Sequence, residues 1–208
     1  HHFIDLSASL VDAAARSGIP SVVTLHDGWA VCPLYHFFRP DGTYCEEGPV
    51  PALACVRCLT GGAGGPGDAA LVKLLEERRD YILSRLSRAD TLLFPSRFML
   101  EKLKRHGLDH PRCVVHPLGL PELSPEPRKA AAANGRVRFG YIGHIHPVKG
   151  LDVLMRAANL LRPGKAELAI HGEVRDPRYF RAAGGELNAP VPVTGHGTYL
   201  RSELPGIL

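Results

Sequence analysis

The sequence predicts an α/β protein made of two Rossmann-like units, both incomplete in this chain. Three observations lead to this prediction. Short β-branched runs typical of buried parallel strands alternate with amphipathic helical stretches, a segment without apolar periodicity divides the chain, and the alternation restarts after it. Such alternation implies parallel sheets with helices on both faces. With 45% hydrophobic and 22% charged residues among 208, the chain can bury a substantial core.

The first unit is expected over residues 1–120. Residues 28–67 form a cysteine-rich irregular segment with many glycines and prolines, and segments of this length are usually functional or separately stabilised. Asp68 is expected to cap the strongest helix, and Pro95-Ser96 to begin the next one. The apolar spacing predicts strands at 21–25, 91–94 and 113–116, and helices at 4–15, 68–88 and 96–106.

A linker is expected over residues 121–135, where Pro, Glu, Ser and Ala replace the apolar pattern. The second unit then covers residues 136–208. Its pattern predicts strands at 137–142, 167–170 and 191–194, and helices at 151–161 and near Tyr179.

The formal net charge is +4, and basic residues are concentrated between 73 and 112. A solvated helix surface is the simplest explanation of this basic region, and contact with anionic lipid headgroups is the second. No run of eighteen apolar residues occurs, so we expect no membrane-spanning helix.

A candidate phosphate site lies in the turn Gly143-His-Ile-His-Pro-Val-Lys149-Gly150, between a predicted strand and helix. Glycines let backbone approach a ligand, and a helix start presents free amide groups. Lys149 would offset the charge that develops on a leaving diphosphate. The turn matches neither common nucleotide-binding glycine motif. An ordinary strand-to-helix turn with an incidental lysine is therefore the alternative.

A second candidate site is His26 with Asp27, which follow the predicted strand at 21–25. Ligands of open α/β sheets bind at the carboxyl ends of the strands, so this position favours a functional role. A core histidine satisfied by hydrogen bonds is the alternative. Trp29, the only tryptophan, either packs in the core or stacks on a sugar.

Four of the five cysteines lie in the irregular segment, with the spacing C-x12-C-x9-C-x2-C. Four thiolates on such a segment suit tetrahedral zinc, and the closed sulfur shell predicts a structural metal without catalytic function. An iron–sulfur cluster and reduced free thiols are the alternatives. Cys113 is expected to be a small buried hydrophobe. The predicted ligands are Cys32, Cys45, Cys55 and Cys58.

Several segments resemble one family of enzymes. Gly18-Ile-Pro-Ser-Val-Val-Thr-Leu-His-Asp-Gly-Trp-Ala-Val-Cys-Pro33 is similar to an HD-x-W-x-x-CP region, and Phe139-Gly-Tyr-Ile-Gly-His-Ile-His-Pro-Val-Lys-Gly-Leu-Asp-Val-Leu154 to the opening of a donor domain. Phe94-Pro-Ser-Arg-Phe98, Val115-His-Pro-Leu-Gly119 and His196-Gly-Thr-Tyr-Leu-Arg-Ser-Glu-Leu204 also match. The family is glycosyltransferase family four, which has the GT-B fold of two Rossmann-like domains.

The resemblance implies a retaining transferase of polysaccharide or glycoconjugate biosynthesis. Its donor would be a nucleoside diphosphate sugar, its acceptor a sugar, lipid-linked or other glycan, and no metal would act at the reaction centre. A cytoplasmic location is implied, with peripheral contact to the inner membrane face through residues 73–112 and no nucleic-acid partner. The implied catalytic residues are His26 and Lys149, with Asp27 and Trp29 on the acceptor side. The implied donor-binding residues are Gly143, His144, Lys149, Gly150 and Gly172.

Two departures from the family pattern carry consequences. His144 stands where many relatives have arginine, which would make the phosphate contact pH-sensitive. The stretch with the family's donor-binding glutamates is expected beyond Leu208, so we expect an internal fragment with little transferase activity by itself. A sugar-nucleotide epimerase of the same fold, a zinc-ribbon nucleic-acid binder and a noncatalytic scaffold are the alternatives.

Overall fold

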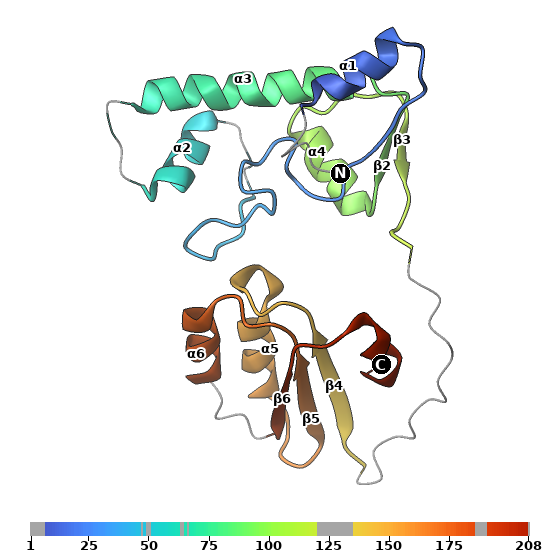
Figure 1. Cartoon of the computed structure of the whole chain (residues 1–208). Coiled ribbons are helices and arrows are strands. Elements are labelled where there is room, and N and C mark those ends of the chain that lie inside the picture. Colours follow the sequence, from blue (N-terminus) through green and yellow to red (C-terminus); the bar gives the residue numbers. More distant parts are fainter. Residues whose placement is uncertain are drawn as a thin grey trace. The chain divides into compact units, whose positions relative to one another are not determined.

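A computed structural model describes residues 7–46, 48, 51–62, 65, 67–119, 135–185 and 191–207. The chain divides into two compact units, His1–Gly119 and Leu120–Leu208. Each unit contains a three-stranded parallel sheet with helices between its strands (Figure 1). The predicted α/β class and its two parallel sheets are confirmed, and residues 121–134 of the predicted linker lie outside the described residues.

The first sheet has the order β1-β2-β3, with all neighbours parallel. Its strands coincide with the predicted apolar runs, because a contiguous β-branched or aliphatic segment is what a strand of a covered parallel sheet requires. The long connection from the first strand to the second contains two helices. The strands are β1 (Val22–Thr24), β2 (Thr91–Phe94) and β3 (Cys113–Val115).

The helices of the first unit are α1 (Ser9–Arg16), α2 (Ala52–Thr60), α3 (Asp68–Leu86) and α4 (Arg97–Arg105). Helices at the positions of α1, α3 and α4 are as predicted, although residues 4–6 of the first predicted helix lie outside the described residues. Ser96 caps α4 as expected, because its side chain accepts a hydrogen bond from the Met99 amide at 3.2 Å. The cap of α3 is different: Gly67 holds that position, and no side chain caps the helix.

The prediction of an irregular segment over 28–67 is wrong for α2. This helix begins after Pro51 and ends at Gly61, whose φ of 69° is the left-handed conformation that commonly ends a helix. Ala52 and Val56 are buried one turn apart, and the helix packs against α3. The surrounding glycines and prolines suggested a loop, but nine residues with a buried face suffice for a helix that another helix covers.

The core of the first unit lies between its sheet and its helices. Ile82 and Leu86 from α3 are buried there, whereas Leu71 and Leu74 in the other half of the same helix are exposed. The predicted apolar face of α3 is therefore buried only along its second half. The core also contains Val23, Leu25, Leu92, Phe94, Leu103, Val31 and Phe37.

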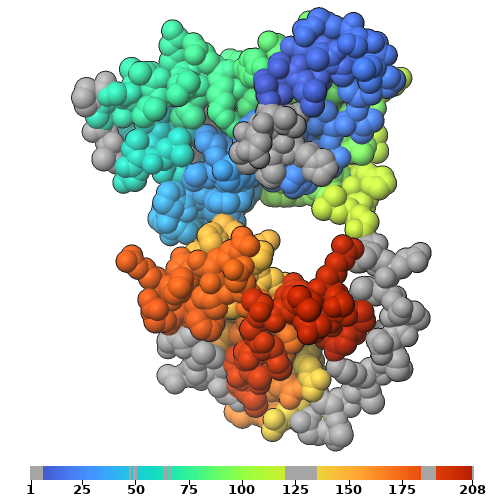
Figure 2. Space-filling view, viewed as in Figure 1, coloured from blue at the N-terminus to red at the C-terminus, as the bar shows by residue number. Residues whose placement is uncertain are grey.

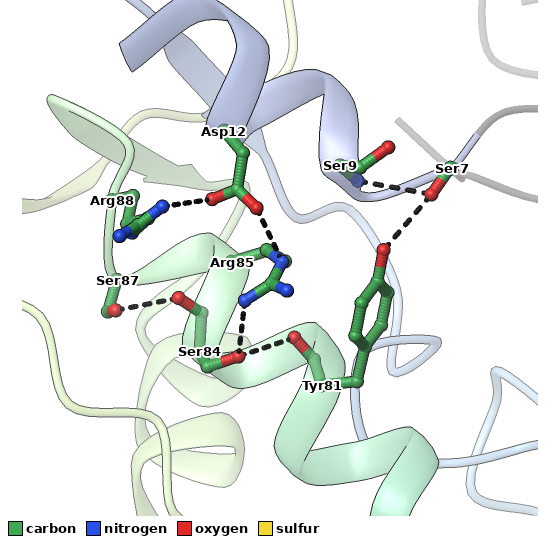
Figure 3. A network of polar contacts seen from close by, with 8 residues as sticks. All are labelled: Ser7, Ser9, Asp12, Tyr81, Ser84, Arg85, Ser87 and Arg88. Atoms are coloured by element: carbon green, nitrogen blue, oxygen red, sulfur yellow. Dashed lines mark hydrogen bonds and ion pairs between the residues drawn. The ribbon is translucent and has the colours of Figure 1, made fainter. Parts of the chain in front are cut away.

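A polar cluster joins α1 to α3 (Figure 3). The Asp12 carboxylate, on α1, accepts a hydrogen bond from Arg88 at 2.8 Å and pairs with the Nε of Arg85 at 2.6 Å. Just before α1, the Ser7 hydroxyl lies 3.1 Å from the Tyr81 hydroxyl. The side chain of Asp12 is only 7% exposed, so this ion pair is shielded from solvent on the carboxylate side.

The second sheet has the order β4-β5-β6, again parallel throughout. Its strands overlap the predicted ones, although β6 begins two residues later and ends three residues later than the predicted strand at 191–194. The elements are β4 (Val137–Ile142), the short 3-10 helix η1 (Pro147–Lys149), α5 (Leu151–Ala158), β5 (Ala166–His171), α6 (Pro177–Gly185), β6 (Val193–Gly197), the 3-10 helix η2 (Arg201–Glu203) and α7 (Leu204–Ile207).

The central strand β5 alternates buried and half-buried residues, and Leu168 and Ile170 point into a core with Leu151 and Met155 of α5. The helices α5 and α6 contact each other. Because two successive right-handed crossovers in one direction place both connecting helices on one side, α5 and α6 share a face of this sheet. The prediction of helices on both faces is not met by these two connecting helices.

Within the described residues, no helix is both long enough and apolar enough to cross a membrane.

Candidate functional site

His26 and Asp27 leave the carboxyl end of β1, where the sheet ends and the chain turns away. The Nε2 atom of His26 lies 3.5 Å from Oδ2 of Asp27, and the two side chains are 30% and 25% exposed. The other carboxylate oxygen of Asp27 accepts the Trp29 amide at 2.8 Å. The carboxylate therefore holds the turn and also lies where it can orient the imidazole.

A small cavity of about 10 Å³ lies beside these residues. Its volume is close to that of a single water probe, so in this form it cannot hold a sugar ring. It is lined by Thr24, Leu25, His26, Asp27, Trp29, Ala30, Ile82 and Leu86.

Trp29 packs against the core of the first unit. The guanidinium of Arg78 lies 4.8 Å from the centroid of the indole, and the same side chain donates to the Trp29 carbonyl at 2.7 Å. One face of the indole is thus occupied by a cation, which stabilises packing at this position. A sugar would have to stack on the other face.

The turn after Asp27 is held tightly by backbone contacts. The Gly28 amide donates to the Tyr35 carbonyl at 2.6 Å, and the Cys32 amide donates to the Gly28 carbonyl at 2.7 Å. A Cβ atom at Gly28 would overlap the Phe37 ring, so only glycine fits there. The position of Asp27 and Trp29 therefore depends on the fold of the segment that carries the first cysteines.

In the second unit, the predicted phosphate turn leaves the carboxyl end of β4 and runs beside the residues that follow β5. The Gly143 amide donates to the His171 carbonyl at 3.0 Å, and the Ile145 amide donates to the Glu173 carbonyl at 2.8 Å. A Cβ atom at Gly172 would overlap the Gly143 carbonyl oxygen. Glycine at 172 is therefore required for this close approach of two backbones.

Lys149 ends the 3-10 helix η1 and is exposed. Gly150 follows it in the left-handed conformation, with φ of 68°. His144 is half exposed, and its Nδ1 lies 3.4 Å from the Glu173 carboxylate, which also pairs with Arg175 at 3.0 Å. An anion at this turn would compete with Glu173 for His144 of the turn and for Arg175, which follows β5.

The start of α5 is less open to a ligand than the sequence suggests. The Asp152 amide donates to the Tyr179 hydroxyl at 2.9 Å, and that hydroxyl donates to the Asp152 carboxylate at 2.5 Å. Burial and the bond to Asp152 raise the pKa of Tyr179 to about 12. Partial burial opposes ionisation of Asp152, but Tyr179 and Arg156 hold its pKa below the usual value. At least one amide expected to bind phosphate is already engaged by protein.

Two histidines that the sequence did not single out meet at the same edge of the second sheet. The rings of His171, at the end of β5, and His196, in β6, are stacked with centroids 4.3 Å apart and planes 3° apart. Burial and the neighbouring imidazole lower the pKa of His171, which favours the neutral ring in this stack. Their proximity depends on the register of β5 and β6, which local sequence does not reveal.

The four cysteines predicted as metal ligands line one cavity of about 30 Å³, which we call the cysteine pocket. Cys32 follows the turn after β1, Cys45 follows the bridge between Phe38 and Tyr44, and Cys55 and Cys58 lie on α2. In Figure 2 the surface of residues 32–46, in blue, adjoins the cyan surface of α2. Cys113 lies elsewhere, in β3, with its thiol 3.5 Å from the His110 carbonyl.

None of the four cysteines in the pocket forms a disulfide. Burial, together with the neighbouring cysteines, raises the pKa of Cys55 to about 11. Burial also raises the pKa of Cys32, although amide hydrogen bonds from Phe37 and Leu34 oppose this. As the side chains lie, no three His, Cys, Asp or Glu residues in the described part of the chain form a metal shell.

A scan of protein-family models finds no family that matches this chain, and a search of curated proteins finds no match either.

Proposed function

We propose that this chain is part of a retaining glycosyltransferase that moves a sugar from a nucleoside diphosphate sugar to an acceptor hydroxyl. The observation that carries the proposal is the turn of the second unit at the carboxyl ends of β4 and β5. There Gly143 and Gly172 are in close contact, and neither has a side chain to cover the backbone. The turn that contains Gly143 also carries the exposed Lys149. Parallel α/β sheets bind their ligands at this edge.

The donor would bind through its diphosphate. Lys149 is a mobile point charge that can follow the phosphate as negative charge develops on it. Arg175 and protonated His144 can add positive charge once the diphosphate displaces Glu173 from them.

The acceptor would lie against the end of β1. His26, oriented by Asp27, would hold the acceptor or the transferred sugar by hydrogen bonds. In the reaction the bond from the anomeric carbon to the diphosphate oxygen breaks, and the bond to the acceptor oxygen forms on the same face. The acceptor proton passes to the departing diphosphate. Retention is implied by the family resemblance alone.

The test of donor binding is Lys149→Ala. Because a hydrogen bond to a charged group contributes about 1.5–3 kcal/mol, we expect affinity for UDP-glucose or GDP-mannose to fall roughly 10- to 100-fold. Isothermal titration with the chain measures this. The matched control is Lys165→Ala, which removes an exposed lysine just before β5, at the amino end of the strand. It should bind like the unmodified chain.

Equal binding by the Lys149→Ala and Lys165→Ala variants would contradict the donor role of Lys149. Product analysis separates the alternative activities. A new sugar nucleotide formed without any acceptor would indicate an epimerase, and strongly salt-dependent binding of oligonucleotides would indicate a nucleic-acid binder. We expect neither a new sugar nucleotide in the absence of acceptor nor salt-dependent oligonucleotide binding.

A further inference from the structure

The cysteine pocket brings together thiols from three separate segments of the first unit. Its four cysteines span the turn after β1, the residue after Tyr44, and helix α2. On α2, Cys55 and Cys58 are three residues apart and therefore lie on one face of the helix, toward the pocket that both line. Four cysteine thiols are the ligand set of a closed structural zinc site.

Backbone amides point at two of these sulfur atoms. The Gly48 amide donates to Sγ of Cys45 at 3.3 Å, and Sγ of Cys32 accepts amides of Leu34 and Phe37. Amide donors that are aimed at sulfur are the outer-shell contacts that orient a metal-binding thiolate. A neutral buried thiol gains much less from them, because hydrogen bonds to a charged group are the stronger ones.

The backbone around Cys32 is strained in a way that creates these contacts. Tyr35 and Phe37 both have positive φ, 61° and 57°, although neither is glycine. Such conformations are unfavourable for residues other than glycine and persist only where surrounding structure enforces them. Here they bend the chain back, so that the Phe37 amide reaches Cys32 and the Phe37 carbonyl accepts the Cys45 amide at 2.6 Å.

We propose that the four thiolates of the cysteine pocket bind one zinc ion, which closes the segment between the end of β1 and α2. This site is independent of the proposed transferase function. Binding requires the thiols to rotate toward the cavity centre, since the Cys55 thiol now points at the Gly48 carbonyl, 3.9 Å away. Four sulfur ligands complete a tetrahedral shell, so the ion would stabilise the fold and hold no substrate.

The site would also position the residues that follow β1. The turn at Gly28 is bonded to Tyr35 and Cys32, so an ion held by Cys32 restricts the segment that carries Asp27 and Trp29. Fluorescence of Trp29, the only tryptophan, therefore reports on the zinc-dependent stability of this unit.

The experiment measures metal content in the chain purified under reducing conditions. We expect about one equivalent of zinc, with no iron and no visible absorption, and we expect cobalt to replace zinc with the absorption of a tetrahedral thiolate site. In the Cys55→Ser, Cys58→Ser double variant, zinc should fall to less than about a tenth of an equivalent. Cys113→Ser is the matched control and should retain the full equivalent, because its thiol lies outside the pocket.

A second measurement does not depend on whether a variant folds. Zinc is removed from the unmodified chain by a chelator under reducing conditions and then restored, and the thermal transition of Trp29 fluorescence is followed. We expect the transition to shift to lower temperature without zinc and to return with it, because a ligand that binds only the folded state stabilises that state.

Three results would overturn the proposal. The first is less than about half an equivalent of zinc together with four reactive pocket thiols and no change on addition of the metal. The second is iron with visible absorption, which would indicate an iron–sulfur cluster. The third is a decrease of the free-thiol count by two or four under non-reducing conditions, which would indicate disulfides.

Discussion

Lys102 shows how one buried charge determines the shape of the cysteine segment. Its side chain is 2% exposed, and its Nζ donates to the carbonyls of Cys45 and Glu46, each at 2.9 Å. The same ammonium lies about 5 Å from the ring centroids of Phe37 and Tyr44. A buried ammonium is stable only when groups such as carbonyls and aromatic rings replace its water. Lys102 therefore joins α4 to the cysteine segment.

Replacing Lys102 with methionine keeps the apolar stem but leaves two carbonyls without a donor. We expect Lys102→Met to lower the free energy of unfolding of the first unit by about 1–3 kcal/mol. Urea denaturation followed by Trp29 fluorescence measures the effect. Lys104→Met, an exposed position on the same helix, is the control. Equal stability of the two variants would mean that Lys102 does not hold this segment.

In the second unit, Gly172 is a single residue on which the local structure depends. Gly172→Ala forces a Cβ into the Gly143 carbonyl oxygen, and we expect it to cost about 1–3 kcal/mol, because packed backbone cannot move aside without strain. Gly195→Ala is the control, since its Cβ would meet open space. Thermal melting followed by far-UV circular dichroism should show the loss of stability of the second unit. The thermal transition of Trp29 fluorescence, which reports on the first unit, should not change. A Gly172→Ala chain with unchanged circular dichroism melting would contradict the close contact.

At the scale of elements, the Asp12 carboxylate on α1 pairs with Arg85 in α3 and with Arg88 just after it (Figure 3). The hydrogen bond from Arg88, aided by the charge of Arg85, lowers the pKa of Asp12 below its usual 3.8. Because the folded state prefers the ionised form, the pair stabilises the fold above about pH 4. The stabilisation is lost as the pH falls through the lowered pKa of Asp12.

We therefore expect Asp12→Asn to lower the melting temperature of the first unit by several degrees at pH 7. The difference from the unmodified chain should shrink below pH 4 and vanish once Asp12 is protonated in both the folded and unfolded states. Thermal melts across this pH range, followed by Trp29 fluorescence, measure this. Asp80→Asn removes an exposed carboxylate on α3 and should change little. A difference that stays constant with pH would show that charge is not the cause.

At the scale of the whole molecule, the chain consists of two units with separate cores and separate candidate sites. Basic residues of the 73–112 region are partly engaged within the first unit: Lys73 pairs with Glu77, Arg79 with Asp80, and Arg85 and Arg88 with Asp12. These pairs agree with the simplest explanation of the basic region, a solvated helix surface. Contact with anionic lipid stays a prediction.

The sequence by itself determined the class and the order of the elements. Each strand of a covered parallel sheet needs a contiguous apolar run, and Thr91–Phe94 shows that requirement in its own residues. The position of His26 at a strand end followed from the same local pattern. Helix α2 carried a local signal as well, in the spacing of Ala52 and Val56, but its glycine- and proline-rich surroundings obscured it.

Only the tertiary structure decided which residues from distant segments lie in contact. It gathered four cysteines around one cavity, buried Lys102 against two carbonyls, stacked His171 on His196 and occupied the start of α5 with Tyr179. Each of these depends on contacts between segments far apart in the chain. No local pattern encodes them, because the free energy of such a contact belongs to the pair of segments and to the packing that brings them together.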